Sequence, residues 1–489
     1  MKKFIHTNKK YVFFCLYSIL ALFGILLGVM QVKPPRVNEA SPYYPAYIRM
    51  MDNIKRFTKE PHPSGSIEIE RVRTEILAKI EAMGLSPLVE DAAYSVDEYV
   101  EDIRPERYTE EEWKQALEQQ WESDEGNQIK LEYGVNSMDE WWEYRLHDIG
   151  ADALQNILVK LDAPDSERGI MFVSHYDSYR DSPGAADDMM SVCAMLEAMR
   201  VHAQNNTLKN DLYFLLTDGE ERNLMGAKKF VNAHPDLKDK LDMVINIDKR
   251  GSSGGVILFE TSEQAYRLLN TVIQSGAKPI GMSWLSDIYR MMPNTNTDFT
   301  PFLDAGYSGV NFGGVEGVQH YHNPGDSFDN LNPNTAWHFL LTTLALAEHM
   351  ANNTLDELNK SSHDAVYFPF LPQVLVHMPL WVSNVICVVA CLLTLAYGLW
   401  QTKQKQLKPS LATILMGALL VLSIGSAIWF PAGSYLFYIP LFAMTIIKFL
   451  RKWNIAFHTA IALCGIAVLL IWVPVVFLLY VGVIQPMML

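Results

Sequence analysis

Long uncharged apolar runs occupy the two ends of the chain, whereas short apolar runs alternate with polar segments in its middle. Residues 11–30 carry no charge, and residues 365–489 contain no Asp or Glu. An α-helix of about 20 apolar residues crosses the roughly 30 Å hydrocarbon core of a bilayer. The pattern therefore predicts an N-terminal transmembrane anchor at 11–30 and a C-terminal transmembrane bundle at 378–489, with spans at 378–400, 409–430, 434–450 and 456–480.

The middle of the chain, residues 40–365, reads as one α/β domain with a mostly parallel or mixed central sheet and flanking helices. Short β-rich apolar runs predict strands at 156–161, 169–174, 212–217, 243–248, 255–260 and 309–313. Apolar positions at helical spacing predict helices at 66–84, 189–203, 225–234, 262–275 and 334–352. Such sheets gather their functional groups where strands end and loops begin.

Residues 97–150 interrupt this alternation and are rich in Glu and Trp. We interpret them as a helical acidic insertion. Two readings stay open: a solvated surface excursion with a small core of its own, or a lid over the active site. Loops around 280–300, together with this insertion, are the regions that we expect to set specificity.

Charge is distributed as unevenly as hydrophobicity. Residues 39–364 hold all 55 acidic residues but only 28 of the 40 basic ones, a net charge of −27. Nucleic acid is excluded as a partner, because its binding needs clustered Lys and Arg to neutralise phosphates. The remaining basic residues flank the apolar runs, as in 401–408 and 451–453, and the positive-inside rule then predicts cytoplasmic residues 1–10 and an extracytoplasmic middle domain.

The same N-terminal pattern also resembles a signal sequence, but its apolar run is long and no small-residue cleavage site follows, which favours an uncleaved anchor. The protein is thus expected to be an integral, multi-pass membrane protein in contact with the lipid bilayer. Whether the outer side is a periplasm, the cell exterior or an organelle lumen is left open, as is the oligomeric state.

Groups that bind metal ions follow three of the predicted strands. His175 follows the strand at 169–174, Glu220 and Glu221 follow the strand at 212–217, and Asp248 ends the strand at 243–248. Further acidic or imidazole groups precede a predicted helix or lie late in the domain, namely Asp187, Asp188, His320 and His322. Because His and carboxylate together suit Zn²⁺, this convergence predicts a zinc site.

The number of these groups suits two metal ions. Two zinc ions about 3.5–4 Å apart need one bridging carboxylate and roughly two further ligands each. A carboxylate that orients a ligating imidazole is also expected, and Asp177, two residues after His175, is placed for this role. Other readings compete: Asp187 and Asp188 as a helix N-cap pair, an ion pair between Asp248 and its basic neighbours, and His320 in place of His322.

At these residues the sequence resembles metallopeptidase family 28, and its membrane-anchored layout looks like the Fxna-type endoplasmic reticulum branch. The resemblance runs from about residue 45 to 355, although the insertion at 97–150 is not expected in the common core. It rests on the motifs EPHPSGS (60–66), SHYDS (174–178), PGAADD (183–188), DGEE (218–221), NID (246–248), TDFTPF (297–302) and YHNPGDS (321–327).

The resemblance implies a zinc-exopeptidase-like fold and roles for individual residues. His175 and Asp248 would complete one zinc site, Glu221 and His322 the other, and Asp187 would bridge both. Glu220 would be the general base that activates water and then protonates the leaving amine. Tyr321 would hydrogen-bond the developing oxyanion, and Asp298 would support the site.

These roles imply a membrane-anchored two-zinc exopeptidase that acts on peptide substrates as an aminopeptidase, with Co²⁺ or Mn²⁺ as substitute metals. Two alternatives remain. One is a glutaminyl cyclase-like enzyme with a single zinc, although such cyclases tend to have serine where Asp188 stands and tryptophan where Tyr321 stands. The other is a non-catalytic scaffold on a peptidase-like fold, which would be expected to lose ligands.

Overall fold

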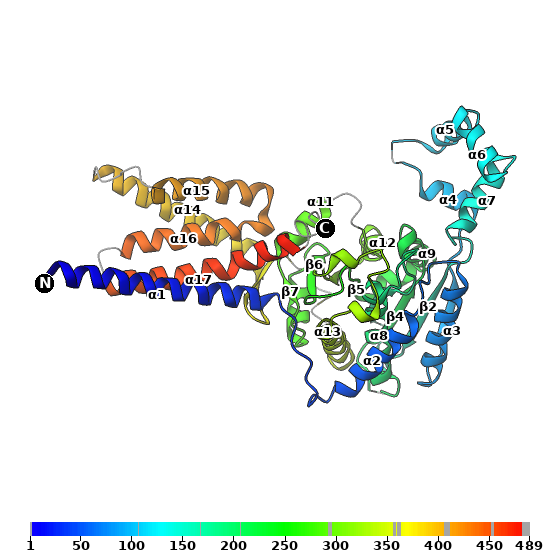
Figure 1. Ribbon diagram of the computed structural model, residues 1–489, viewed down its shortest axis with the longest axis horizontal. Helices are drawn as coiled ribbons and strands as arrows, with labels where there is room; N and C mark the ends of the chain where they lie inside the picture. The colour runs from blue at the N-terminus through cyan, green and yellow to red at the C-terminus, as the bar shows by residue number, and fades with distance from the viewer. Residues whose placement is uncertain are drawn as a thin grey trace.

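An α/β domain and a bundle of long apolar helices from both ends of the chain lie end to end in space (Figure 1). The computed structural model describes residues 2–105, 107–166, 168–205, 207–291, 296–355, 358, 363–404, 411–450 and 454–481. The α/β domain holds the central sheet and the polar groups at its edge, and it is the part that positions the site.

The central sheet has eight strands and mixed direction. Its order across the sheet is β1 (Leu88–Asp91), β2 (Gln155–Leu161), β4 (Asp211–Thr217), β3 (Gly169–His175), β5 (Leu241–Ile247), β8 (Gly309–Gly313), β6 (Ile257–Thr261) and β7 (Ile280–Gly281). The four middle strands run parallel, while β1, β2 and β6 add antiparallel pairings. The predicted mixed α/β fold is confirmed.

Strands β4, β3 and β5 form the centre of the sheet, and every residue in them is buried. They read as continuous apolar runs rather than alternating ones because helices cover both faces. In the register of the sheet, His175 lies opposite Thr217, and Val173 lies opposite Asn246. The carboxyl ends of the three strands therefore meet at one edge.

Helices pack on both faces of this sheet. One face is covered by α2 (Tyr44–Phe57), α3 (Ile67–Glu81), α8 (Met190–His202), α10 (Tyr266–Gln274) and α13 (Pro333–Asn352), which share one apolar core. The other face is covered by α9 (Met225–Ala233) and α12 (Phe299–Asp304). Helix α11 (Ser283–Met291) contacts β6.

Several helices, strands and turns of the structure were not predicted from the apolar patterns in the sequence. They are α2, β1, β7, α11, α12, the hairpin β9 (Ala365–Leu371) and β10 (Val374–Pro379), and the short turns η1 (Ala185–Met189), η2 (Glu220–Arg222), η3 (Pro235–Asp239), η4 (Val318–His320), η5 (Phe328–Asn330) and η6 (Pro431–Gly433). Most are too short for a periodic pattern to develop.

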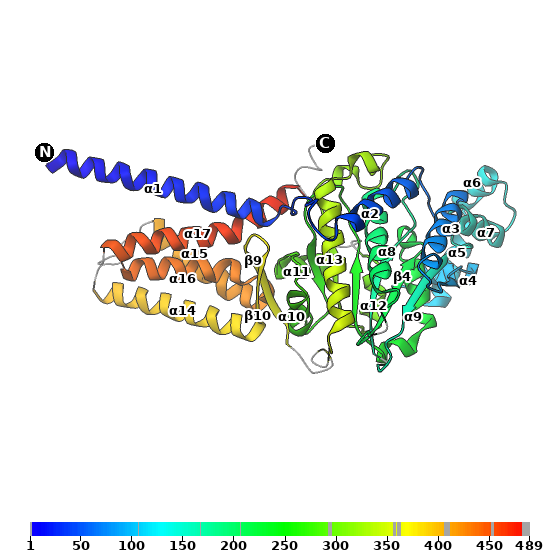
Figure 2. The same cartoon turned by 90° about the horizontal axis from the view of Figure 1, so that it is seen from below.

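The acidic insertion folds into four helices, α4 (Val96–Asp102), α5 (Glu110–Trp121), α6 (Asp124–Tyr133) and α7 (Met138–Asp148). Its base is held on α9, where Lys228 pairs with Asp102 at 2.6 Å and Lys229 pairs with Glu98 at 2.6 Å. Helices α5 and α6 project away from the sheet, at the end opposite the apolar bundle (Figures 1 and 2). In this arrangement the insertion is a side lobe.

The apolar helices lie side by side at the other end (Figure 2). They are α1 (Lys2–Gln31), α14 (Leu380–Lys403), α15 (Leu411–Trp429), α16 (Tyr435–Leu450) and α17 (Asn454–Leu479). Among the described residues, two segments are long and apolar enough to cross a membrane, 380–403 and 461–479, and three shorter apolar helices accompany them. Parts of several predicted segments lie outside the described residues. They are 405–408 of the basic loop at 401–408, the whole basic link at 451–453, residues 292–295 of the loops at 280–300, and residues 409–410 of the predicted span at 409–430.

Candidate metal centre

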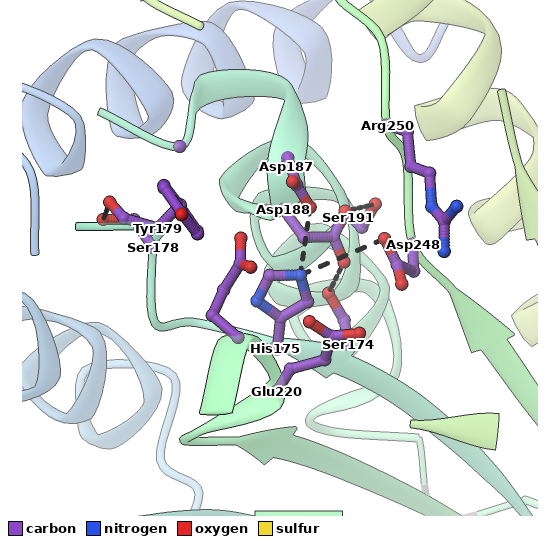
Figure 3. Close-up of polar contacts among 12 residues, drawn as sticks. Ser174, His175, Ser178, Tyr179, Asp187, Asp188, Ser191, Glu220, Asp248 and Arg250 are labelled. Atoms are coloured by element: carbon purple, nitrogen blue, oxygen red, sulfur yellow. Dashed lines mark hydrogen bonds and ion pairs between the residues drawn. The ribbon is translucent and has the colours of Figure 1, made fainter. Parts of the chain in front are cut away.

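His175, the last residue of β3, presents one ring nitrogen to the protein and the other to the edge of the sheet. Its Nδ1 lies 3.0 Å from the backbone oxygen of Asp177 and 3.4 Å from the Asp177 carboxylate. Its Nε2 lies 3.2 Å from Asp187 Oδ1 and 4.0 Å from Asp248 Oδ1 (Figure 3). An imidazole that donates from Nδ1 offers its Nε2 lone pair to a metal, which is the arrangement found in zinc sites.

Asp187 sits in the turn η1 ahead of α8, and a second buried carboxylate holds this turn. Asp326 accepts the backbone N–H of Ala186 at 2.8 Å and that of Asp187 at 3.1 Å. Burial raises the pKa of Asp326 to about 7. Sequence reasoning missed this residue, although it lies in the YHNPGDS motif; a carboxylate within a short polar motif was the available signal.

Glu221 and His322 form a second group around the other oxygen of Asp187. His322 Nε2 lies 2.9 Å from Glu221 Oε2 and 3.6 Å from Asp187 Oδ2. The imidazole stacks on Tyr179, with ring centres 4.1 Å apart, and on Tyr321, with ring centres 3.6 Å apart. Stacking on two rings fixes the plane of the His322 imidazole and therefore the direction of its Nε2 lone pair.

Two sets of ligand atoms thus share Asp187. His175, Asp187 and Asp248 form one set, and Asp187, Glu221 and His322 form the other, with the atoms of each set within 4.8 Å of one another. Within the described part of the chain, Glu221 Oε1 is buried without a hydrogen-bond partner, and His322 Nε2, although 2.9 Å from Glu221 Oε2, makes no aligned hydrogen bond. Buried polar atoms are normally satisfied, so these two atoms indicate that a cation belongs between them.

The pKa values of the carboxylates at this edge of the sheet also indicate a site for cations. Burial and the neighbouring Asp187 carboxylate raise the pKa of Asp248 to about 6 and that of Glu221 to about 7. Burial lowers the pKa of His175, but the carboxylates of Asp177 and Asp187 outweigh burial and raise it above its ordinary value. Several carboxylates crowd a site of low dielectric, and bound cations relieve their repulsion. Zn²⁺ suits this donor set of two imidazoles and three carboxylates.

Asp177 does more than face His175. Its two carboxylate oxygens accept the backbone N–H groups of Glu220 at 3.2 Å and Glu221 at 3.3 Å. The same carboxylate lies 3.4 Å from the Ser64 hydroxyl, which also donates to buried Asp218 at 2.7 Å. The motif at 60–66 therefore supports the turn that carries Glu220 and Glu221.

Glu220 occupies the first position of the turn η2, beside His175 (Figure 3). Burial raises the pKa of its carboxyl group well above the ordinary value, and the negative charges of Asp248 and Glu221 add to this effect. A glutamate with a raised pKa at a metal edge can hold a proton near neutral pH.

The structure separates the residues that competed for ligand positions. Asp188 uses both carboxylate oxygens within the protein, since Ser174 Oγ donates to one at 2.5 Å and Ser191 Oγ donates to the other. His320 Nδ1 lies 2.8 Å from the Ser252 hydroxyl and belongs to neither metal set. Lys249 Nζ donates to the carbonyl oxygen of Ser253 at 2.7 Å.

Asp298 accepts a hydrogen bond from the Thr217 hydroxyl through one carboxylate oxygen. Its other oxygen is buried and has no hydrogen-bond partner among the residues that the structure describes, and burial raises the pKa of Asp298 to about 7. Asp298 therefore lies within the buried polar cluster at this edge, as the TDFTPF motif led us to expect.

Arg250 lies near the rings of two tyrosines, Tyr321 and Tyr289. The guanidinium carbon of Arg250 lies 5.8 Å from the centre of the Tyr321 ring and 6.0 Å from that of Tyr289. Burial raises the pKa of Tyr321, with Asp187 adding to the shift, so the phenol keeps its proton. Arg250 beside Asp248 (Figure 3) was missed from sequence, where it read only as a neighbouring charge.

Comparisons with known proteins find a peptidase family, membrane-protein relatives and solved enzyme structures. Residues 156–347 match the sequence model of peptidase family M28. The chain is 28% identical over 218 residues to a vacuolar membrane protease of Candida dubliniensis, covering 44% of this chain and 23% of that protein. It is 27% identical over 326 residues to endoplasmic reticulum metallopeptidase 1 of Mus musculus, covering 65% of this chain and 35% of that protein. The alignments thus span about a quarter to a third of these relatives' length.

Solved structures of similar fold include two enzyme classes. An aminopeptidase from Aneurinibacillus sp. strain AM-1 aligns with a TM-score of 0.42 at 15% identity, covering 62% of this chain and 93% of that one. The glutaminyl cyclase of Fimbriiglobus ruber aligns with a TM-score of 0.43 at 13% identity, covering 66% of this chain and 98% of that one.

Proposed function

We propose, from the match of residues 156–347 to the sequence model of peptidase family M28, that the chain is a membrane-anchored exopeptidase that uses two zinc ions and acts as an aminopeptidase. The observation that carries the proposal is the sharing of Asp187 between two sets of ligand atoms. A single metal would leave one of these sets, with its buried acidic groups, without a counter-charge.

In the proposed centre, His175 and Asp248 would hold one zinc, Glu221 and His322 would hold the other, and the Asp187 carboxylate would serve both. Two zinc ions bound there would supply an activated water and a Lewis acid for the scissile carbonyl. Co²⁺ or Mn²⁺ would be accepted by the same oxygen and nitrogen donors, since the metal that occupies such a site depends on its availability as well as on ligand type.

The protein's own groups carry the proton and the charge. Glu220, which lies beside His175 in the turn that also carries Glu221, takes a proton from the attacking water and delivers it to the leaving amine. Tyr321 keeps its phenolic proton and donates a hydrogen bond to the developing oxyanion. Asp177 positions both His175 and the turn that carries Glu220.

We further propose that the helices at both ends anchor the domain in a membrane as several spans, with the N-terminus in the cytoplasm and the peptidase domain on the other side. The two apolar segments at 380–403 and 461–479 support membrane insertion. The basic residues around the apolar runs support the orientation. The substrates are then peptides that reach the outer face of that membrane.

The test uses the full chain purified in detergent. We expect two zinc ions per chain by mass spectrometry of the metal, and release of N-terminal residues from peptides that a chelator abolishes. Glu220→Gln should keep both zinc ions and lose about 10²–10⁴-fold in kcat, because only the proton carrier is removed. Glu118→Gln, on an exposed face of α5, is the matched control and should leave kcat unchanged.

Other outcomes would favour the alternatives. One zinc per chain together with pyroglutamate formation from N-terminal glutamine would indicate a glutaminyl cyclase. A protein that binds no zinc even at excess metal would indicate a scaffold. Normal turnover by Glu220→Gln would contradict the proposed mechanism.

A further inference from the structure

A cavity of about 250 Å³ adjoins the metal centre and reaches the apolar helices. Asp248 and Arg250 line it on the side of the metal centre. Helix α11 contributes Trp284 and Ile288, and the end of α17 contributes Leu478 and Leu479. Residues almost 200 positions apart in the chain thus form one cavity beside a proposed zinc ligand.

Helix α17 and the α/β domain contribute buried side chains to one apolar cluster. Leu478 and Val475 of α17 are buried in the same apolar cluster as Ile257 of β6 and Trp284 of α11. In Figure 1 the end of α17 lies beside β6 and α11. The α17 wall of the cavity is therefore fixed relative to the domain.

Helix α11, the opposite wall, is also tied to the apolar bundle. The Ser283 hydroxyl at its start donates to the carbonyl oxygen of Ala432, in the turn between α15 and α16, at 2.7 Å. The same hydroxyl accepts the backbone N–H of Tyr367 in β9 at 3.2 Å. Both walls of the cavity thus depend on the bundle for their position.

The chemistry of the cavity is that of a pocket for one apolar side chain. Its walls are aliphatic and aromatic, and its charged groups are the two beside the metal centre. Its volume lies below the roughly 300–1,000 Å³ of pockets that enclose whole drug-sized ligands, so it suits a side chain rather than a long peptide. The guanidinium of Arg250 lies near the rings of Tyr289 and Tyr321, at the same side of the cavity as Asp248.

We propose that this cavity receives the side chain next to the scissile bond, and that Leu478 and Leu479 of α17 are specificity-determining residues. The inference rests on the proposed exopeptidase function and names its substrate class: peptides whose terminal residue is bulky and apolar. A helix of the apolar bundle then takes part in substrate choice, which gives the bundle a role beyond anchoring.

The experiment compares the full chain and its variants in detergent on four fluorogenic aminoacyl-amidocoumarin substrates, bearing Ala, Leu, Phe or Trp. A methylene in an apolar pocket changes kcat/KM by about 10–200-fold. Leu479→Trp fills the cavity and should lower the Phe-to-Ala ratio of kcat/KM by about tenfold or more. Leu478→Ala enlarges it and should raise the Trp-to-Leu ratio by a similar factor.

The two variants complement each other, because Leu478 is buried whereas Leu479 is 42% exposed and tolerates replacement without loss of the shared core. Val476→Trp is the matched control, since Val476 lies on the same helix end, is 59% exposed and does not line the cavity. This control should leave every ratio within about twofold of the wild type, as expected for a change outside the pocket.

Ratios that stay constant in both variants, or rates that fall in parallel on all four substrates, would overturn the role of α17 and leave the proposed peptidase function intact. A wild-type protein that binds two zinc ions but releases no residue from any substrate would overturn the proposed function and this inference together.

Discussion

The two sets of ligand atoms use the same chemistry but are held by different kinds of structure. His175 and Asp248 follow directly on neighbouring parallel strands, and their side chains are 1% and 7% exposed. Glu221 lies in a short turn, and His322 lies in a loop with a positive φ of 57° and a side chain that is 28% exposed. Sheet ends fix the first set, whereas stacking and backbone hydrogen bonds fix the second.

This difference predicts unequal metal sites. The sheet-end set moves only with the core, because β3 and β5 are fully buried. The loop set depends on the Tyr179 and Tyr321 rings around His322 and on Asp177 below Glu221. Loops open locally at lower free-energy cost than core strands, so we expect the loop set to release its zinc first.

Removal of the shared ligand should have the largest effect. Asp187→Asn keeps the size of the side chain but removes the charge that both sets use, so we expect zinc to fall from two ions per chain to fewer than one. Activity should fall by about 10³-fold or more, beyond the 10–100-fold typical of a lost supporting group. Metal content and kcat on one peptide measure this. Retention of a full zinc complement would show that Asp187 does not bridge.

Changes to one set should have a smaller and separable effect. Glu221→Gln should leave about one zinc per chain, held by the sheet-end set, while Asp248→Asn should weaken the site that depends on the core. When a chelator is added to the wild type, we expect the two zinc ions to leave in two steps, a fast one from the loop set and a slow one from the sheet-end set. In Glu221→Gln we expect only the slow step. Loss of both ions in Glu221→Gln in a single fast step would contradict the unequal-site comparison.

A pH titration should show the smallest difference between the two ligand sets, as a gradual loss of the stabilisation by zinc. Metal ligands must be deprotonated to bind, and the raised pKa values are about 7 for Glu221 and about 6 for Asp248. The stabilisation by zinc is therefore present above pH 7, and is lost first from the loop set as pH falls through about 7 and then from the sheet-end set near 6. The difference in Tm between zinc-loaded and stripped protein, measured from pH 8 to 5.5, should narrow in that order.

Comparison of loaded with stripped protein removes the contribution of groups that behave alike in both. Burial lowers the pKa of His62 to about 4, so this histidine stays neutral over most of the measured range in both forms. The difference in Tm reports on the ligands together with the buried carboxylates beside them, Asp298 and Asp326. A Tm difference that stays constant down to pH 5.5 would contradict the role of the raised carboxylate pKa values.

The sheet-end set could be predicted from the sequence because its signal is periodic. Buried apolar strands can be recognised by length and composition, and polar residues at their ends must meet at one edge when the strands are parallel. His175 and Asp248 followed from this pattern alone. The mixed α/β fold followed from the same pattern.

Glu221 of the loop set follows a predicted strand in the same way, but His322 was not accessible from this pattern. The choice of His322 over His320 came only through family resemblance, since both lie in a short irregular segment. Asp326, whose carboxylate holds the Asp187 turn, lies 139 residues from its partner in the chain. The cavity between α11 and α17 depends on packing between the domain and the apolar bundle, which no local pattern encodes.

The central claim is that Asp187 joins two metal sites, and crystals of the full chain grown with zinc test it most directly by anomalous diffraction at the zinc edge. The account predicts two anomalous peaks about 3.5–4 Å apart, one within bonding distance of His175 and Asp248 and the other within bonding distance of Glu221 and His322, both contacting the Asp187 carboxylate. A single peak, or two peaks that do not share Asp187, would contradict it.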